Sequence, residues 1–111
     1  GIDVEHIGSL SPFEFREQIT DDEWNTIKQS NDPLRAFYRY WTTKEAVIKA
    51  NGKGLNIPLK AFELIEGKTM LEDECWYVTD ISLTSKYSCS LATNVNDCVL
   101  QLILCDCVFA A

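Results

Sequence analysis

The stretch of sequence that decides the fold is PLRAFYRYWTTKEAVIKAN, residues 33–51. Asp32 can cap the start of a helix here, and Pro33 suits the first helical position because its missing amide hydrogen is not needed there. Gly52 follows directly and can end the helix in the left-handed conformation that glycine adopts readily. This pattern predicts one helix of about five turns, from residue 33 to residue 50 or 51.

On a helical wheel, the apolar residues of this helix gather on one side. At about 100° per residue they form one arc that should face the core: Leu34, Phe37, Tyr40, Trp41, Val47 and Ile48. The opposite side, where exposed polar residues are expected, carries Arg35, Arg39, Thr42 and Thr43. Lys44 and Glu45 fall inside the apolar arc, where a charge is costly unless it meets an opposite charge, a metal or a ligand. Both residues therefore need partners.

The segments around the long helix are predicted to form short helices and strands. A strand is expected over residues 1–5, a short helix over 11–18 and a second helix from Thr20 or Asp21 to about residue 30. Further strands are expected over 61–65, 76–83, 87–93 and 99–108, because turn residues separate these runs. We therefore predict an α+β fold in a single domain over 1–111, an antiparallel sheet packed with one long and one or two short helices.

Composition favours one soluble globular domain. The 111 residues are 46% hydrophobic, and no stretch approaches the run of about 20 apolar residues that a membrane span requires. A net charge of -7 argues against binding to nucleic acid, which needs an excess of Lys and Arg. The chain opens on Gly1 without an initiator methionine or a signal peptide, so we expect a processed or truncated chain. Cysteines that stay reduced would place it in the cytoplasm.

The five cysteines of the sequence show no C-x-x-C spacing. They lie in apolar, strand-like surroundings, so we expect reduced thiols that behave as small hydrophobic groups. The alternative is a zinc or disulfide site built on Cys105 and Cys107, for which His6 is the single imidazole in the sequence. A lone histidine is more often structural, and His6 is left out of the expected site.

Acidic side chains from two segments point to a metal. Asp3 and Glu5 lie on the same side of the expected first strand, because side chains alternate along a strand. Glu45 could lie close to Asp3 and Glu5 only if a cation offset the repulsion between the three carboxylates. Hard oxygen ligands favour magnesium over zinc as that cation. Lys44 and Lys49 would then supply positive charge to the oxygens of a diphosphate. Two alternatives stay open: a solvated edge strand, and an ordinary surface pair of Glu45 with Lys49.

Two short motifs carry these charged side chains: GIDVE at residues 1–5 and WTTKEAVIK at residues 41–49. They resemble the G-[IV]-D-x-E and [FW]-[SCT]-x-K-E-[AS]-x-x-K motifs of the 4′-phosphopantetheinyl transferases. The continuation ANGKGL at residues 50–55, with Pro58-Leu59 after it, is also similar to that family. The residues of these motifs are most similar to those of the larger, surfactin-synthetase-activating type. The resemblance spans at least residues 1–60.

The resemblance implies a function and a role for each site residue. Such an enzyme, of the holo-[acyl-carrier-protein] synthase kind, moves the 4′-phosphopantetheine group from coenzyme A to a serine of an acyl or peptidyl carrier protein. By resemblance, Asp3, Glu5 and Glu45 bind Mg²⁺, and Lys44 and Lys49 bind the coenzyme A pyrophosphate. Glu45 and Lys49 are then the catalytic residues, with Glu45 deprotonating the serine directly or through a metal-bound water.

The resemblance also implies that a partner is needed. Larger family members consist of two similar α+β halves with the coenzyme between them, and this sequence resembles the second, C-terminal half. We expect a fragment, or a subunit that needs the N-terminal half or a second copy of itself. Lys28, Arg35 and Arg39 are candidate contacts for an acidic carrier protein. The alternative function is a non-catalytic module that keeps the fold and docks a carrier protein or a partner subunit.

Overall fold

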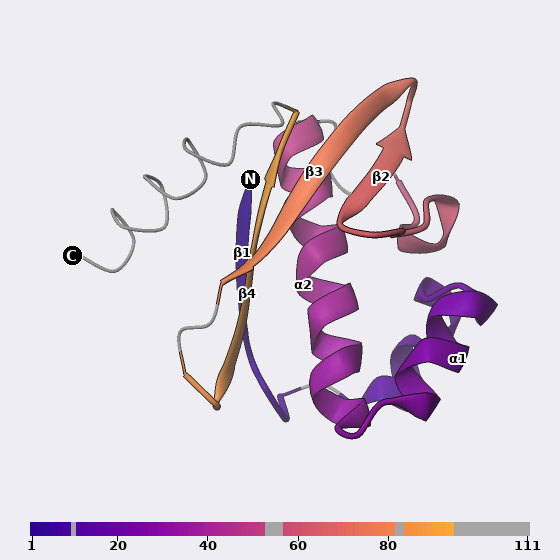
Figure 1. Cartoon of the computed structure of the whole chain (residues 1–111), viewed down its shortest axis with the longest axis vertical. Helices are drawn as coiled ribbons and strands as arrows, with labels where there is room; N and C mark the ends of the chain where they lie inside the picture. The colour runs from indigo at the N-terminus through magenta and orange to yellow at the C-terminus, as the bar shows by residue number, and fades with distance from the viewer. Residues whose placement is uncertain (10, 53–56, 82–83, 95–111) are drawn as a thin grey trace.

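The long helix α2 (Pro33–Asn51) runs through the middle of the molecule (Figure 1). The structure is a computed structural model and describes residues 1–9, 11–52, 57–81 and 84–94. Asp32 caps α2 by accepting a hydrogen bond of 3.1 Å from the Arg35 amide. Gly52 ends the helix with a φ of 77°. The predicted helix is thus confirmed at both of its ends.

Four strands form one antiparallel sheet against α2: β1 (Ile2–His6), β2 (Lys68–Leu71), β3 (Glu74–Ile81) and β4 (Tyr87–Thr93). Their order in the sheet is β1-β4-β3-β2. In this register Asp3 lies opposite Ser90 and Glu5 lies opposite Ser88. Figure 1 shows the sheet along one side of α2, with the β2–β3 hairpin reaching past the helix. The predicted α+β class and antiparallel sheet are confirmed.

Short helices cover the other side of α2. The predicted segment after Ser11 is a 3₁₀ helix, η1 (Pro12–Gln18), and α1 (Asp21–Gln29) follows the capping residue Thr20. An apolar cluster joins these helices to the N-terminal half of α2: Ile19, Ile27, Phe37 and Tyr38. Figure 1 shows α1 beside that half of α2. Within the described residues, none of these helices is long and apolar enough to cross a membrane.

The side of α2 predicted to be exposed at Thr42 and Thr43 is buried against β4, so that prediction is wrong. The Thr42 hydroxyl lies 3.0 Å from the hydroxyls of both Ser88 and Ser90, and the Thr43 hydroxyl lies 3.1 Å from that of Ser90. These hydrogen bonds satisfy the hydroxyl groups without water, so the threonines can lie in the interior. Leu34, which the wheel placed toward the core, is 40% exposed.

The second half of the chain was predicted less well. The expected strand over 61–65 is wrong, because a 3₁₀ turn, η3 (Leu59–Ala61), and an irregular segment occupy that region. The short strand β2 was not predicted. Strand β4 has the predicted bounds, whereas β3 begins two residues earlier than expected, at Glu74. The strand expected over 99–108, and with it the alternative site at Cys105 and Cys107, lies outside the described residues. Neither Cys75 nor Cys89 forms a disulfide bond within the described residues.

Candidate metal and phosphate site

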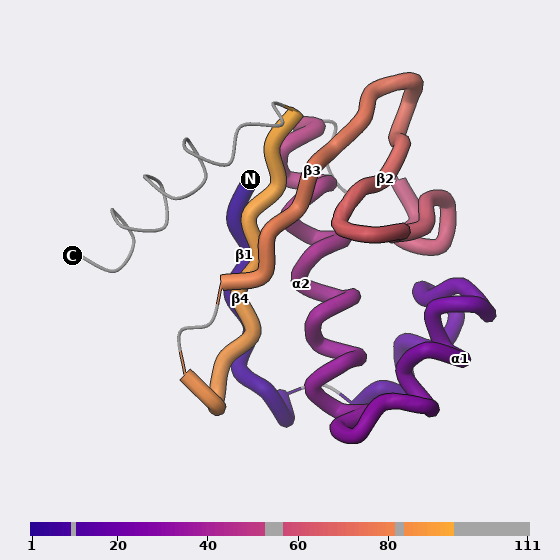
Figure 2. The backbone as a smooth tube through the Cα atoms, viewed as in Figure 1, coloured from indigo at the N-terminus to yellow at the C-terminus, as the bar shows by residue number. Residues whose placement is uncertain are grey.

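Strand β1 brings two carboxylates to the edge of α2. Asp3 and Glu5 alternate with Ile2 and Val4, and Asp3 is buried while Ile2 and Val4 are exposed. Gly1 allows this close approach, because a Cβ atom there would overlap the backbone of α2 at Ala46 and Ala50. Figure 2 shows the amino terminus beside the C-terminal end of α2. The first strand therefore lies against the helix at the turn that carries Glu45 and Lys49.

Lys49 links helix and strand. Its Nζ atom donates a hydrogen bond of 2.7 Å to Asp3 Oδ1 and one of 3.4 Å to the carbonyl oxygen of Ile2. The Lys49 side chain is 53% exposed, whereas that of Asp3 is 5% exposed. The second oxygen of Asp3, Oδ2, is buried and has no hydrogen-bond partner among the described residues. One acidic oxygen is thus bound to a lysine, and the other meets no donor among the described residues unless Glu5 is protonated, when a hydrogen bond to Asp3 helps to raise the pKa of Glu5.

The three acidic side chains influence one another. Burial, followed by the negative charge of Asp3, raises the pKa of Glu5, and the charge of Glu45 adds to this rise. Burial, followed by the charge of Asp3, also raises the pKa of Glu45. The hydrogen bond to Asp3 raises the pKa of Lys49, and both glutamates strengthen that effect. The structure therefore brings Asp3, Glu5 and Glu45 into one electrostatic group with Lys49.

The acidic group is not arranged as a finished metal site. In the parts of the chain that the structure describes, no three His, Cys, Asp or Glu side chains converge as ligands of one ion. The chemistry of the group nevertheless fits magnesium, because every donor is a carboxylate oxygen and Asp3 Oδ2 is buried without a partner. The ammonium of Lys49 supplies the positive charge that these carboxylates require in this structure.

Lys44 lies apart from this group. Its side chain is 0% exposed, and its Nζ atom forms an ion pair of 2.6 Å with Glu23 of α1. Burial lowers the pKa of Lys44, while the hydrogen bond and the charge of Glu23 oppose that change. The structure thus brings together four of the five predicted site residues and separates Lys44 from them. Sequence reasoning missed Glu23, for which the capping-box spacing from Thr20 was the available signal.

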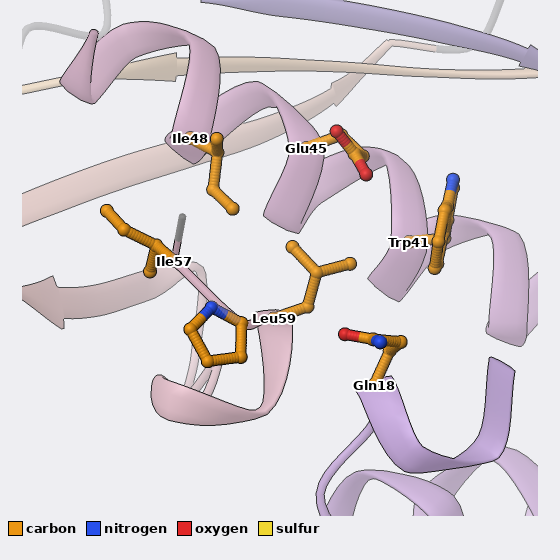
Figure 3. Close-up of a pocket in the computed structure, with 7 residues that line it drawn as sticks. Gln18, Trp41, Glu45, Ile48, Ile57 and Leu59 are labelled. Atoms are coloured by element: carbon orange, nitrogen blue, oxygen red, sulfur yellow. The ribbon is translucent and has the colours of Figure 1, made fainter. Parts of the chain in front are cut away.

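A cavity of about 420 Å³ opens beside Glu45 (Figure 3). Trp41, Glu45 and Ile48 of α2 line one wall, and Ile57, Pro58 and Leu59 line the facing wall, with Gln18 of η1 at the end. Figure 3 shows the Glu45 carboxylate at the edge of this cavity, near Trp41. Glu45 therefore lies between the acidic group on one side and a largely apolar hollow on the other.

These features define an α+β domain in which three carboxylates and a lysine meet between the first strand and the long helix. Residues 1–98 match the profile of the 4′-phosphopantetheinyl transferase superfamily, and the chain belongs to that superfamily.

Individual relatives agree with this placement. The chain is 35% identical over 72 residues to the 4′-phosphopantetheinyl transferase gsp of Aneurinibacillus migulanus, covering 62% of this chain and 30% of that protein. It is 34% identical over 107 residues to the L-aminoadipate-semialdehyde dehydrogenase-phosphopantetheinyl transferase of Xenopus laevis, covering 77% and 35%. It is 32% identical over 66 residues to the 4′-phosphopantetheinyl transferase Sfp of Bacillus subtilis, covering 58% and 30%. The matches thus span about a third of the length of these relatives.

Proposed function

We propose that this chain is the magnesium- and coenzyme-A-binding part of an enzyme that transfers 4′-phosphopantetheine from coenzyme A to a serine of an acyl or peptidyl carrier protein. Membership of the superfamily and the printed names of the relatives support the reaction class. The observation that carries the proposal is the group of Asp3, Glu5, Glu45 and Lys49, in which a buried oxygen of Asp3 has no partner among the described residues.

Asp3, Glu5 and Glu45 would hold the magnesium ion. When bound, this ion would supply positive charge to the diphosphate of coenzyme A as the bond to the leaving group breaks. It would also offset the mutual repulsion of the carboxylates, which adds to the larger effect of burial in raising the pKa of Glu5 and of Glu45. Lys49 would then be released from Asp3 and could turn its ammonium toward a phosphate oxygen, since its side chain is about half exposed.

The reaction needs a proton acceptor near the attacking serine. The serine hydroxyl oxygen would form a bond to the β-phosphorus of coenzyme A, and the bond from that phosphorus to the oxygen of adenosine 3′,5′-bisphosphate would break. Glu45 would take the proton of the hydroxyl. Its place between the acidic group and the cavity suits that role.

The proposal includes partners beyond this chain. Because the matches span about a third of each relative, we infer that the coenzyme also contacts an N-terminal half or a second subunit. Among the basic residues expected to meet a carrier protein, Lys28 is exposed on α1. Arg39 forms a surface ion pair of 3.3 Å with Asp80, and Arg35 donates to the carbonyl oxygen of Ser85 at 3.2 Å. Lys28 is therefore the freest of the three for docking. A cytoplasmic location belongs to the same proposal.

A mass measurement tests the proposed function. The chain is mixed with coenzyme A, Mg²⁺ and an apo carrier protein, alone and together with the N-terminal half of a relative. We expect the carrier protein to gain the mass of one phosphopantetheine group, and expect no gain when Mg²⁺ is chelated. A carrier protein that stays unmodified in every mixture would contradict transfer and leave the non-catalytic interaction module as the function.

A further inference from the structure

All three donors of the buried Lys44 ammonium are occupied. Its Nζ atom donates to Glu23 Oε1 at 2.6 Å and to the carbonyl oxygens of Leu59 and Phe62 at 2.8 Å each. A protonated lysine has three N–H donors and no acceptor, so this environment matches the charged form. No donor remains for a phosphate oxygen, and the side chain is 0% exposed. In this structure the Lys44 ammonium is therefore fully engaged by groups of the chain itself.

Glu23 connects the same ammonium to two further segments. Its Oε1 atom also accepts a hydrogen bond of 3.1 Å from the Thr20 amide at the start of α1. Its Oε2 atom accepts one of 3.0 Å from the amide of Leu64. The carboxylate thereby joins the start of α1 to the irregular segment after η3. Together with Lys44 on α2, three separate parts of the chain meet at one buried ion pair.

The segment held by this ion pair forms one wall of the cavity beside Glu45. Leu59, whose carbonyl oxygen binds Lys44, lines the cavity with Ile57 and Pro58. Glu45, the residue after Lys44, lines the facing wall. Figure 3 shows the Leu59 side chain directed toward α2. The distance between the two walls is thus fixed by hydrogen bonds from a side chain next to the proposed catalytic base.

We propose that Lys44 and Glu23 form a positioning pair, which holds residues 59–64 against α2 and keeps the cavity beside Glu45 open to substrate, and that Lys44 does not contact coenzyme A. The consequence for substrate rests on the proposed function, whereas the structural role of the pair does not. A buried ion pair is costly to break one partner at a time and often neutral to remove as a whole, so it is suited to specifying one arrangement of the segments that it joins.

Hydrogen exchange tests the structural role on the chain itself. The variants are Lys44→Met, Glu23→Gln and the double variant, with Lys60→Met as the matched control because Lys60 is exposed in the same segment. We expect the Leu64 amide to exchange about tenfold or more faster in each single variant, because one buried charge is left unpaired. The double variant should lose less protection than the two single variants combined, and the control should match the wild-type chain.

Two outcomes would overturn the structural role: unchanged exchange at Leu64 in Lys44→Met, or effects that simply add in the double variant. If a single variant fails to fold, the double variant decides. Recovery of the folded state when both charges are removed supports the pair, and failure to recover contradicts it.

Steady-state kinetics with the full transferase test the consequence for substrate. We expect both single variants to lower kcat by a similar factor while the KM for coenzyme A stays within about twofold, because neither residue touches the coenzyme. A rise in that KM in Lys44→Met, with none in Glu23→Gln, would instead assign Lys44 to the phosphates and overturn the proposal. If the wild-type protein shows no transfer, the proposed function fails, and the exchange experiment still decides whether the pair exists.

Discussion

At the scale of single residues, Glu45 lies at the junction between the two parts of this site. It is half-buried on α2, its pKa is raised by burial and by Asp3, and it borders both the acidic group and the cavity. We predict that Glu45→Gln lowers kcat for phosphopantetheine transfer by about 100-fold or more, because the residue proposed as general base and as metal ligand is then lost. The variant should unfold at a urea midpoint no lower than that of the wild type, since size and shape are preserved and a carboxyl group with a raised pKa is removed. Turnover within about threefold of wild type would contradict the role of Glu45.

Gly1 determines how closely β1 approaches α2. A Cβ atom at this position would overlap backbone atoms of Ala46 and Ala50, which cannot move without shifting the helix. We predict that Gly1→Ala destabilises the fold by about 1–3 kcal/mol, the usual cost of overpacking, as measured by urea denaturation. Adding Ala50→Gly should not restore stability, because the overlap is with main-chain atoms. A rescue by Ala50→Gly would show that the side chain of Ala50 sets the spacing.

The raised pKa of Glu5 predicts a stability that depends on pH. A carboxyl that holds its proton more tightly when folded destabilises the fold as pH rises from the ordinary value of 4.5 through its raised value. Without divalent ions, Glu5→Gln should therefore gain stability relative to wild type as pH increases from about 4 to about 8. Urea midpoints of both proteins across this range provide the measurement. A constant difference between the two curves would contradict the raised pKa.

At the scale of secondary structure, the contact between α2 and β4 depends on hydroxyl groups. The Thr42 hydroxyl bonds to those of Ser88 and Ser90 in the interior. We predict that Thr42→Val destabilises the fold by about 1–3 kcal/mol, because the two serine hydroxyls lose a buried partner. Thr26→Val, at an exposed position of α1, is the control and should change the free energy of unfolding by less than about 0.5 kcal/mol. Equal effects of the two substitutions would show that helix propensity dominates.

Local signals explain which elements could be predicted from sequence. Helix α2 has a cap at Asp32 and a stop at Gly52, and strand β4 is bounded by turn residues, so both were predicted with their bounds. Strand β2 has four residues, too few to show alternation. In the turn after it, Glu72 and Asp73 have φ values of 51° and 65°, and positions with this conformation are usually occupied by Asn or Gly. Strand β2 and the turn after it therefore depend on pairing with β3 rather than on a local sequence pattern.

The site was predictable to the extent that it follows from strand alternation and helix spacing. Those rules group Asp3 with Glu5 and Glu45 with Lys49, and the structure brings the two pairs together. These rules could not identify the partner of Lys44. Glu23 belongs to another helix, and no regular sequence spacing relates residues of two different helices. The position of Lys44 inside the apolar arc was nevertheless a correct indication that its charge is buried.

At the scale of the whole molecule, the chain presents its site at an edge. The acidic group lies between β1 and α2, and the cavity lies between α2 and residues 57–59. The coenzyme proposed to bind there would be held in part by a partner half. We predict that the isolated chain transfers phosphopantetheine more slowly than the same chain supplied with the N-terminal half of a relative, because the adenosine end is then held. Equal rates in the carrier-protein mass assay would show that this chain alone forms the site.

The central claim is that Asp3, Glu5 and Glu45 share one divalent ion in the presence of a diphosphate. The most direct measurement is the titration of the carboxyl-labelled chain with Mn²⁺ and coenzyme A, read by paramagnetic broadening of the carboxyl signals in NMR spectra. We predict that the three signals broaden first and together, and that Asp3→Asn abolishes the effect at the other two. Broadening that is spread over exposed carboxylates, with these three signals unchanged, would contradict the claim.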